Sequence, residues 1–309
     1  MKSWFQRMFA VSALALLAAC GGDDDAAPGT VVQVAQADAR FSTLVEAVTA
    51  ADLATTLAGP GPLTVFAPTN DAFAALLTEL GITKAQLFAD KALLTSVLTY
   101  HVLPARIERA QVPVGKAIAT AQGGVFKVDA VGTALVATDG RNRQATITAT
   151  DVAASNGLIH VVDKVLLPAN KTIVQTAQAL PGFGILVQAV TAANLAAPLS
   201  APGPLTVFAP TDAAFADLLA ELGITQQQLL ADIPLLTKVL TYHVVPGRVL
   251  KADVPVAMPI ATLQGDSLSV SNGLVITDQR ARSAHIVATD VLASNGVIHV
   301  LDKVILPRP

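Results

Sequence analysis

The sequence predicts an α+β fold class that is built twice along the chain. Residues 60–69 and 202–211 both read PGPLTVFAPT, and further identical blocks follow each copy in the same order. Within each copy, apolar residues first recur at helical spacing and then in short β-branched runs, an order typical of an α+β domain. Each unit is large enough to bury its own core, so we expect two tandem domains and not a solenoid of short repeats.

The first half of each unit has the pattern of helices around one buried strand. Phe41, Leu44, Val45 and Val48 stand at i, i+3, i+4 and i+7, which predicts an amphipathic helix. Residues 63–67 (LTVFA) follow as a short β-rich run that suits a buried strand.

Two further helices are expected after this strand. Asn70 and Asp71 place hydrogen-bond acceptors at the first free N–H groups of one helix, and Gly81 stands where that helix would end. Thr83 and Gln86 form a Thr-x-x-Gln capping box, which starts the next helical region.

The second half of each unit has the pattern of antiparallel strands. From about residue 112 the chain changes to short β-branched runs, such as 125–128. Asn156-Gly157 predicts a tight hairpin, because both residues tolerate positive φ. Residues 158–167 (LIHVVDKVLL) are the expected returning strand. The second copy is three residues shorter in a middle loop of this half.

The N-terminus predicts an exported lipoprotein. Lys2 and Arg7 precede an apolar run over residues 8–19, which has the length of a signal-peptide core and is too short to span a bilayer. The run ends in Leu-Ala-Ala before Cys20, the only cysteine, and this resembles the lipobox of bacterial lipoproteins. The resemblance implies removal of residues 1–19 and lipidation of Cys20. An ordinary secretory peptide is the alternative.

Residues 20–33 are expected to form a flexible tether. They contain glycine, proline and three adjacent aspartates without hydrophobic periodicity. In bacterial lipoproteins an aspartate directly after the cysteine favours the inner membrane. Gly21 stands there, so the resemblance implies an outer-membrane location on the periplasmic or surface face.

Composition excludes several function classes. Hydrophobic residues make up 52% of the chain, yet no later run of about eighteen apolar residues predicts another membrane span. The net charge of −3 provides no basic surface for nucleic acid. Because no second cysteine is present, the exported domains must be stabilised by core packing. We expect neither a cofactor nor a metal ion.

Three blocks make each unit similar to a fasciclin domain. They are TVFAPTNDAFA over residues 64–74, Tyr100-His101 after a leucine-rich helix, and NGLIHVVDKVLLP over residues 156–168. The second copy repeats all three blocks in the same order.

This resemblance implies two fasciclin-like domains, over residues 34–169 and 173–307. Each would be a β-wedge or sandwich packed with several α-helices. Members of the family are exported, often tandem, and associated with cell adhesion and with matrix or surface interactions.

The resemblance also implies candidate interaction residues. In animal members the Tyr-His pair is implicated in integrin binding, which by position points to Tyr100, His101, Tyr242 and His243. Helical spacing, however, places His101 on the same stripe as the core leucines of its helix. A buried neutral imidazole with both nitrogens hydrogen-bonded is therefore the structural alternative to ligand contact.

A second repeated polar set allows a catalytic interpretation. It consists of a strand histidine, an aspartate three residues later and an aspartate across the hairpin: His160, Asp163 and Asp151, repeated as His299, Asp302 and Asp290. Catalysis would need a nucleophile or metal nearby, and the sequence has no Gly-x-Ser-x-Gly or His-Glu-x-x-His motif. We therefore expect these side chains to hold loops through hydrogen bonds, and we expect no catalytic residue.

Taken together, the sequence favours a non-enzymatic, lipid-anchored protein of the bacterial cell envelope. Its two domains would mediate adhesion or a surface interaction with an unknown protein or glycan, while the lipid engages the membrane. A binding module for a small apolar ligand or a glycan is the alternative function.

Overall fold

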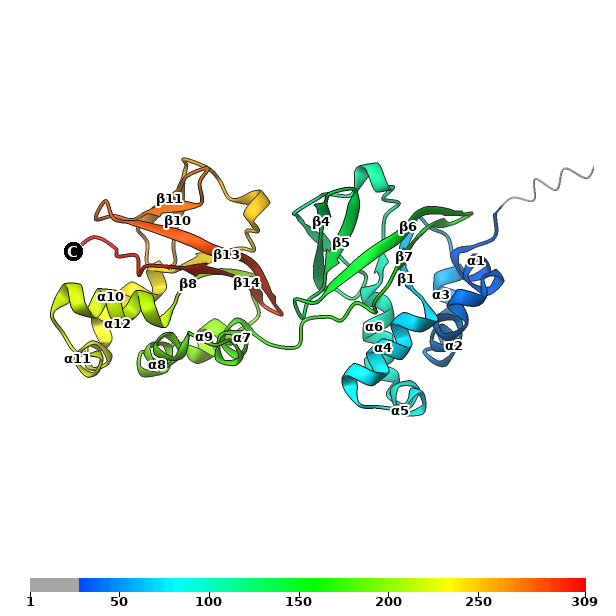
Figure 1. Cartoon of the computed structure of the whole chain (residues 1–309), viewed down its shortest axis with the longest axis horizontal. Helices are drawn as coiled ribbons and strands as arrows, with labels where there is room; N and C mark the ends of the chain where they lie inside the picture. Colours follow the sequence, from blue (N-terminus) through cyan, green and yellow to red (C-terminus); the bar gives the residue numbers. More distant parts are fainter. Residues whose placement is uncertain (1–27) are drawn as a thin grey trace, which may run out of the picture.

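The computed structural model describes residues 28–309 and shows two α+β domains of the same design. In each domain short helices cover one side of a seven-stranded sheet, and one loop connects the domains (Figure 1). The predicted signal peptide and Cys20 lie outside the described residues. The first domain begins at helix α1 (Val31–Ala37), so the last residues of the expected tether belong to the folded unit.

The two domains contain the same elements in the same order, except that η1 of the first domain has no counterpart in the second. The first domain consists of α1, η1 (Ala39–Phe41), α2 (Ser42–Ala50), α3 (Ala54–Ala58), β1 (Leu63–Pro68), α4 (Asn70–Leu80), α5 (Lys84–Ala89), α6 (Lys91–Tyr100), β2 (Val102–Leu103), η2 (Arg109–Gln111), β3 (Ala117–Ala119), β4 (Val125–Val131), β5 (Ala134–Thr138), β6 (Gln144–Ala154) and β7 (Gly157–Val162). The second domain consists of α7 (Ile173–Ala179), α8 (Gly184–Ala192), α9 (Ala196–Ser200), β8 (Leu205–Pro210), α10 (Asp212–Leu222), α11 (Gln226–Ala231), α12 (Ile233–Tyr242), β9 (Val244–Pro246), η3 (Lys251–Asp253), β10 (Pro259–Ala261), β11 (Ser267–Val270), β12 (Val275–Thr277), β13 (Ser283–Ala293) and β14 (Gly296–Leu301).

One parallel strand pair joins the helical half of each domain to the strand half. The sheet order is β2-β1-β7-β6-β5-β4-β3 in the first domain and β10-β11-β12-β13-β14-β8-β9 in the second. Strand β1 pairs in parallel with β7, from Leu63 opposite Gly157 to Pro68 opposite Val162, whereas the other pairs are antiparallel. The early strand that the sequence predicts alone is therefore an interior strand of the sheet, between β2 and β7.

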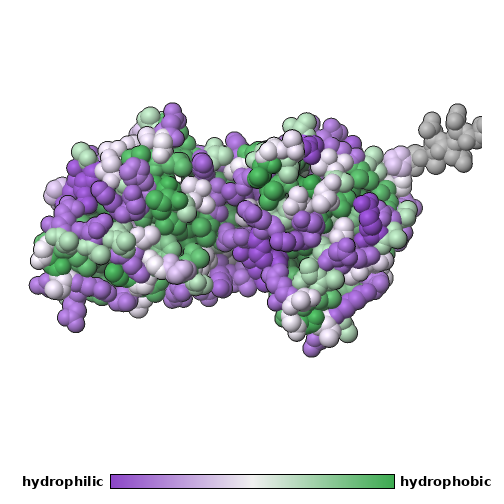
Figure 2. Space-filling view, viewed as in Figure 1, coloured by the Kyte–Doolittle hydropathy of each residue, from purple (hydrophilic) through white to green (hydrophobic). Residues whose placement is uncertain are grey.

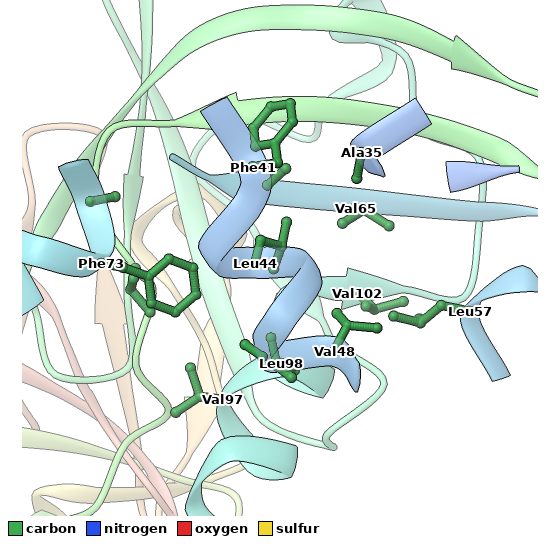
Figure 3. Close-up of a cluster of buried hydrophobic side chains, with 14 of the residues drawn as sticks. Ala35, Phe41, Leu44, Val48, Leu57, Val65, Phe73, Val97, Leu98 and Val102 are labelled. Atoms are coloured by element: carbon green, nitrogen blue, oxygen red, sulfur yellow. The ribbon is translucent and has the colours of Figure 1, made fainter. Parts of the chain in front are cut away.

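The central strands are buried on both faces. Val65 and Ala67 of β1 face the helices and pack with apolar side chains from α2, α4 and α6 (Figure 3). Phe66 points to the opposite face, where it meets Phe126 with ring centroids 5.0 Å apart. Because side chains alternate along a strand, one short strand supplies both halves of the core.

The predicted hairpin forms, but the physical reason given for its glycine is wrong. Strands β6 and β7 are joined by a two-residue turn, and neither Asn156 nor Gly157 has positive φ. A Cβ atom on Gly157 would lie 2.1 Å from the carbonyl oxygen of Leu63 in β1, and one on Gly296 would lie 2.0 Å from that of Leu205. Glycine is therefore required by the close approach of the parallel strand.

The polar residues at the start of α4 also act differently from the prediction. Thr69 caps this helix by accepting a hydrogen bond from the N–H of Ala72. Asn70 instead accepts from the N–H of Thr43 at 2.9 Å, and so serves the start of α2. Asp212 in the second domain does the same for α8. These side chains fasten two helices together across the chain.

Other local predictions are confirmed. The capping box of Thr83 and Gln86 is present, and Gly81 ends α4 in the left-handed conformation with φ of 64°. The three missing residues of the second copy lie between β11 and β12, which form a shorter hairpin than β4 and β5. Among residues 28–309, the helices all lack the length and apolar character needed to cross a bilayer.

The contact between Gly157 and Leu63 makes a testable prediction. Gly157→Ala should lower the free energy of unfolding by about 2 kcal/mol or more, because the added methyl group forces the two central strands apart. Gly273→Ala is the matched control, since its Cβ would be 3.7 Å from the nearest atom, the Oγ of Ser271. Denaturant unfolding of the full chain measures both changes. Equal stability of the two variants would contradict this account.

Candidate functional site at the tyrosine-histidine pairs

The Tyr-His pairs lie where α6 and α12 end and the next strand begins. Tyr100 is the last residue of α6 and His101 is its C-cap, and Tyr242 and His243 hold the same positions at the end of α12. Leu98 and the other buried apolar residues of α6 pack this helix against the core. The exposed fraction of Tyr100 is 0% and that of His101 is 2%, so the pair belongs to the interior.

Both histidines of these pairs are fully hydrogen-bonded as neutral rings. His101 donates from Nδ1 to the carbonyl oxygen of Val97 at 2.7 Å and accepts at Nε2 from the N–H of Leu166 at 2.9 Å. His243 repeats the arrangement with Val239 and Ile305. Burial lowers the pKa of both histidines to about 4, because a charged imidazole would lose its hydration and the Nε2 acceptor.

The tyrosines tie the helices to the far strands. Tyr100 donates its hydroxyl proton to the carbonyl oxygen of Val125 at 2.6 Å, and Tyr242 donates to that of Ser267 at 3.0 Å. The ring of Tyr100 also packs edge-on against Phe126, with centroids 6.0 Å apart. Burial raises the pKa of both hydroxyls above the ordinary value, so they remain protonated donors.

These observations place the four candidate interaction residues in the core. Their polar atoms are engaged within the domain, and their side chains offer almost no surface to a partner. The geometry matches the alternative of a buried neutral imidazole with both nitrogens hydrogen-bonded, which fastens the end of the helix to the neighbouring segments. A direct role in adhesion stays a prediction that this packing does not support.

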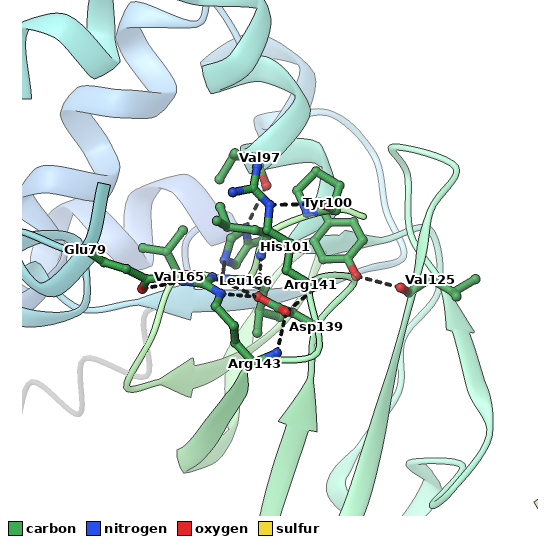
Figure 4. Close-up of polar contacts among 12 residues, drawn as sticks. Glu79, Val97, Tyr100, His101, Val125, Asp139, Arg141, Arg143, Val165 and Leu166 are labelled. Atoms are coloured by element: carbon green, nitrogen blue, oxygen red, sulfur yellow. Dashed lines mark hydrogen bonds and ion pairs between the residues drawn. The ribbon is translucent and has the colours of Figure 1, made fainter. Parts of the chain in front are cut away.

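An aspartate beside the first pair was missed by the sequence reasoning. Asp139 follows β5 and is 1% exposed. Its carboxylate accepts hydrogen bonds from the backbone N–H groups of Arg141, Arg143 and Leu167 (Figure 4). It also forms an ion pair with the Arg143 guanidinium, 2.8 Å away. The Arg143 guanidinium also forms an ion pair with Glu79 of α4 at 2.7 Å. The cluster therefore joins α4, the loop after β5 and the segment after β7.

The second domain contains a reduced version of this cluster. Asp278 accepts from the N–H groups of Arg280, Arg282 and Leu306, as Asp139 does from its neighbours. The Arg282 guanidinium, however, pairs with Glu221 at 2.9 Å. The repeated Asp-x-Arg-x-Arg pattern at 139–143 and 278–282 was the sequence signal that could have revealed both clusters.

The set that allowed a catalytic interpretation holds loops. His160 is 0% exposed; its Nε2 donates to the carbonyl oxygen of Ile107 at 2.9 Å, and its Nδ1 accepts from the N–H of Asp151 at 3.3 Å. Asp151, which has φ of 60°, accepts from the N–H of Arg109 at 2.8 Å. Asp163 does not contact this group, because it accepts from the N–H of Thr146.

The corresponding group of the second domain has the same geometry. His299 donates to the carbonyl oxygen of Val249 and accepts from the N–H of Asp290, and Asp302 accepts from the N–H of His285. Within residues 28–309, His, Cys, Asp and Glu side chains form no cluster that could hold a metal ion.

Two apolar cavities lie at equivalent places beneath the first helices. The cavity in the first domain measures about 40 Å³ and lies among residues of α1, α2 and β1, with His101 in its wall. Its counterpart in the second domain measures about 30 Å³. Sites for drug-sized molecules are usually about 300 Å³ or larger, so these cavities do not favour the apolar-ligand alternative.

The structure also brings the two domains into contact. Asn142 donates to the carbonyl oxygen of Leu292 at 3.0 Å and accepts from its N–H at 2.7 Å. Lys127 lies 3.0 Å from Asp290, where both side chains are largely buried. Ala117 packs against an apolar cluster from the second domain, and a band of hydrophilic residues covers the junction in Figure 2.

Comparison with known proteins gives a consistent result. A family model described as Fasciclin domain matches residues 39–168 and 181–307. Protein sll1483 of Synechocystis sp. (strain ATCC 27184 / PCC 6803 / Kazusa) is 47% identical over 143 residues, which cover 45% of this chain and 73% of that protein. Periostin of Homo sapiens is 26% identical over 286 residues, which cover 91% of this chain but only 32% of periostin.

A solved structure is also similar. It is the FAS1 domain pair from the insect cell adhesion molecule fasciclin I, with a TM-score of 0.44 and 17% sequence identity. The match covers 89% of this chain and 95% of that one.

The buried histidines predict that stability falls in mildly acidic solution. The pKa of His101 and His243 is about 4 in the folded chain and 6.5 ordinarily, so the unfolded state binds more protons between these values. The free energy of unfolding should therefore fall as the pH drops from about 6.5 towards 4, by at most about 3 kcal/mol for each histidine. Burial lowers the pKa of His160 and His299 as well, which adds to the same trend.

Urea unfolding between pH 7.5 and 4.5 measures this dependence. The double variant His101→Gln and His243→Gln should show a shallower slope with pH than the unchanged chain. Unchanged stability across this range would refute the prediction.

The two aspartate clusters predict unequal effects of the same substitution. Asp139→Asn places an amide N–H group among donors and removes the ion pair with Arg143, which should cost about 3 kcal/mol. Asp278→Asn should cost less, because the Arg282 guanidinium forms its ion pair with Glu221 and, among the described residues, none with Asp278. Hydrogen exchange at the N–H groups of Leu167 and Leu306 reports each domain separately. Equal losses of protection would show that the ion pair does not matter.

Proposed function

Because the chain belongs to the fasciclin domain family, we propose that it is a non-enzymatic adhesion module of the cell envelope. The observation that carries the proposal is the pair of complete family matches on one chain, over residues 39–168 and 181–307. Each match corresponds to a domain with its own sheet and its own buried core. The partner is a protein or a glycan on a matrix, a neighbouring cell or another surface.

The proposed contact surface lies on the strand halves of the domains. The Tyr-His pairs are buried, so a partner meets other residues. Large apolar side chains that are exposed include Val131 at 60%, Met258 at 61% and Val287 at 59%, and all three lie on or next to the strands. We propose that these exposed apolar side chains contribute to the surface that a partner contacts.

Two domains on one chain make the proposed module bivalent. The contacts of Asn142 and Lys127 hold the domains against each other, so both strand halves are presented together. Once one domain has bound, the second binds at a raised effective concentration, which increases avidity without any stronger single contact.

We also propose that a lipid on Cys20 holds the protein at the membrane. The support is the sequence before Cys20 together with the tether that follows it. Acyl chains on this residue stabilise membrane attachment by about 0.8 kcal/mol for each buried CH₂ group. The lipid would then hold both domains at the membrane surface, where they can contact a partner.

Attachment assays test the proposal. Cells that produce the full chain should attach to matrix-coated or cell-coated surfaces several-fold better than cells without it. Cys20→Ala should abolish the gain although the domains fold normally, because the protein is no longer retained on the cell. Val287→Ser should reduce attachment, whereas Leu222→Ser, which changes an exposed residue of α10 on the helical half, should not. Equal attachment of all these cells would refute the proposal.

A further inference from the structure

One half-buried cation at the junction of the domains has no counter-charge among the described residues. Arg248 follows β9 in the second domain, and its Nε atom is buried without a hydrogen-bond partner among residues 28–309. No carboxylate of the described chain forms an ion pair with this guanidinium. Burying one N–H group of a guanidinium without a partner is costly, so the arrangement calls for an explanation.

The equivalent arginine of the first domain shows what has changed. Arg106 donates to the carbonyl oxygen of Gly157 at 3.0 Å and pairs with Glu108 at 3.3 Å. In the second domain the position of Glu108 is taken by Leu250, which is 0% exposed and packs in the apolar cluster at the junction. The second domain therefore has the arginine without an acidic residue at this position.

Arg248 lines a cavity of about 300 Å³ between the two domains. The walls come from four parts of the chain: the β3–β4 loop with the start of β4, the connecting loop, the segment after β9, and the end of β13 with its turn. The lining residues are Gln122, Gly123, Gly124, Val125, Pro168, Ala169, Arg248, Leu292, Ala293 and Ser294. Arg248 is the only charged residue among them, so the cavity carries a net positive charge.

The chemistry of the walls indicates the kind of ligand. A guanidinium presents several N–H donors in a planar fork that matches the oxygens of a carboxylate. Gln122 and Ser294 add an amide and a hydroxyl group, while Pro168 and Leu292 add apolar contact. The volume suits a ligand of about monosaccharide size, at the lower end of ordinary binding sites.

We propose that this cavity binds a small organic acid, whose carboxylate pairs with Arg248 between the two domains. The ligand would supply the negative charge that Glu108 provides in the first domain. It would contact both domains and the connecting loop, and would therefore stabilise their arrangement. The proposal goes beyond adhesion and stands independently of it, because binding is measured with the purified chain.

Galacturonate and galactose form a suitable pair of probes, because they differ in the carboxylate. Isothermal titration with the full chain should show binding of galacturonate and at least tenfold weaker binding of galactose. Acetate and sulfate test whether a carboxylate alone or a tetrahedral oxyanion also binds. Competition of acetate with galacturonate would support the carboxylate contact, whereas preference for sulfate over every carboxylate would overturn it.

Matched variants locate the site. Arg248→Gln should weaken galacturonate binding at least tenfold, and Arg106→Gln, which changes the equivalent arginine outside the cavity, should leave it unchanged. Ser294→Asp keeps the arginine and places a competing carboxylate on the wall, so it should also abolish binding. This variant remains informative if Arg248→Gln fails to fold. Absence of binding by any acid at tens of millimolar, or equal binding by all variants, would overturn the proposal.

Discussion

The parallel pairing of β1 with β7, and of β8 with β14, is the constraint on which each domain depends. The first strand of each pair comes from the helical half of the sequence and the second closes the strand half. Their side chains alternate between a core shared with the helices and a core shared with the other strands. If the two strands could not approach, each half would lose the surface on which it packs. Glycine at Gly157 and Gly296 makes the approach possible because no Cβ atom would fit.

Buried polar groups then fix how the remaining elements meet this pair of strands. His101 is a donor at Nδ1 and an acceptor at Nε2, whereas His160 is an acceptor at Nδ1 and a donor at Nε2. The two rings are therefore neutral in opposite tautomers, and each satisfies backbone groups that would otherwise be buried without partners. Asp139 does the same for the segment after β7. The polar residues that the two copies share are thus used mainly for construction.

The contact between the domains depends on residues in which the two copies differ. Lys127 and Asn142 bind the second domain, and the equivalent positions there hold Ser269 and Ala281. The second domain therefore cannot repeat the same contacts with a further domain of this type. Leu250 illustrates the opposite change, because it replaces an acidic residue and packs into the junction. Duplication supplied the domains, and later divergence supplied the surface between them.

Much of the fold was accessible from the sequence because its signals are local. Apolar spacing, capping boxes and β-branched runs predicted the helices, the strands and the hairpin, since each depends on residues only a few positions apart. Local signals were insufficient where a side chain serves a distant segment. The position of Asn70 predicts a cap for its own helix, but its side chain holds the start of α2. The role of Asp139 depends on Leu167, which lies far along the chain.

The sequence by itself determined that the chain carries two α+β units of the fasciclin type behind a predicted N-terminal anchor. Only the tertiary structure decided that β1 runs parallel to β7, that Tyr100 and His101 are buried, and that the domains enclose Arg248. Strand direction, burial and the distance between charges are properties of segments brought together from far apart in the chain. A pattern read along one stretch of sequence does not contain them.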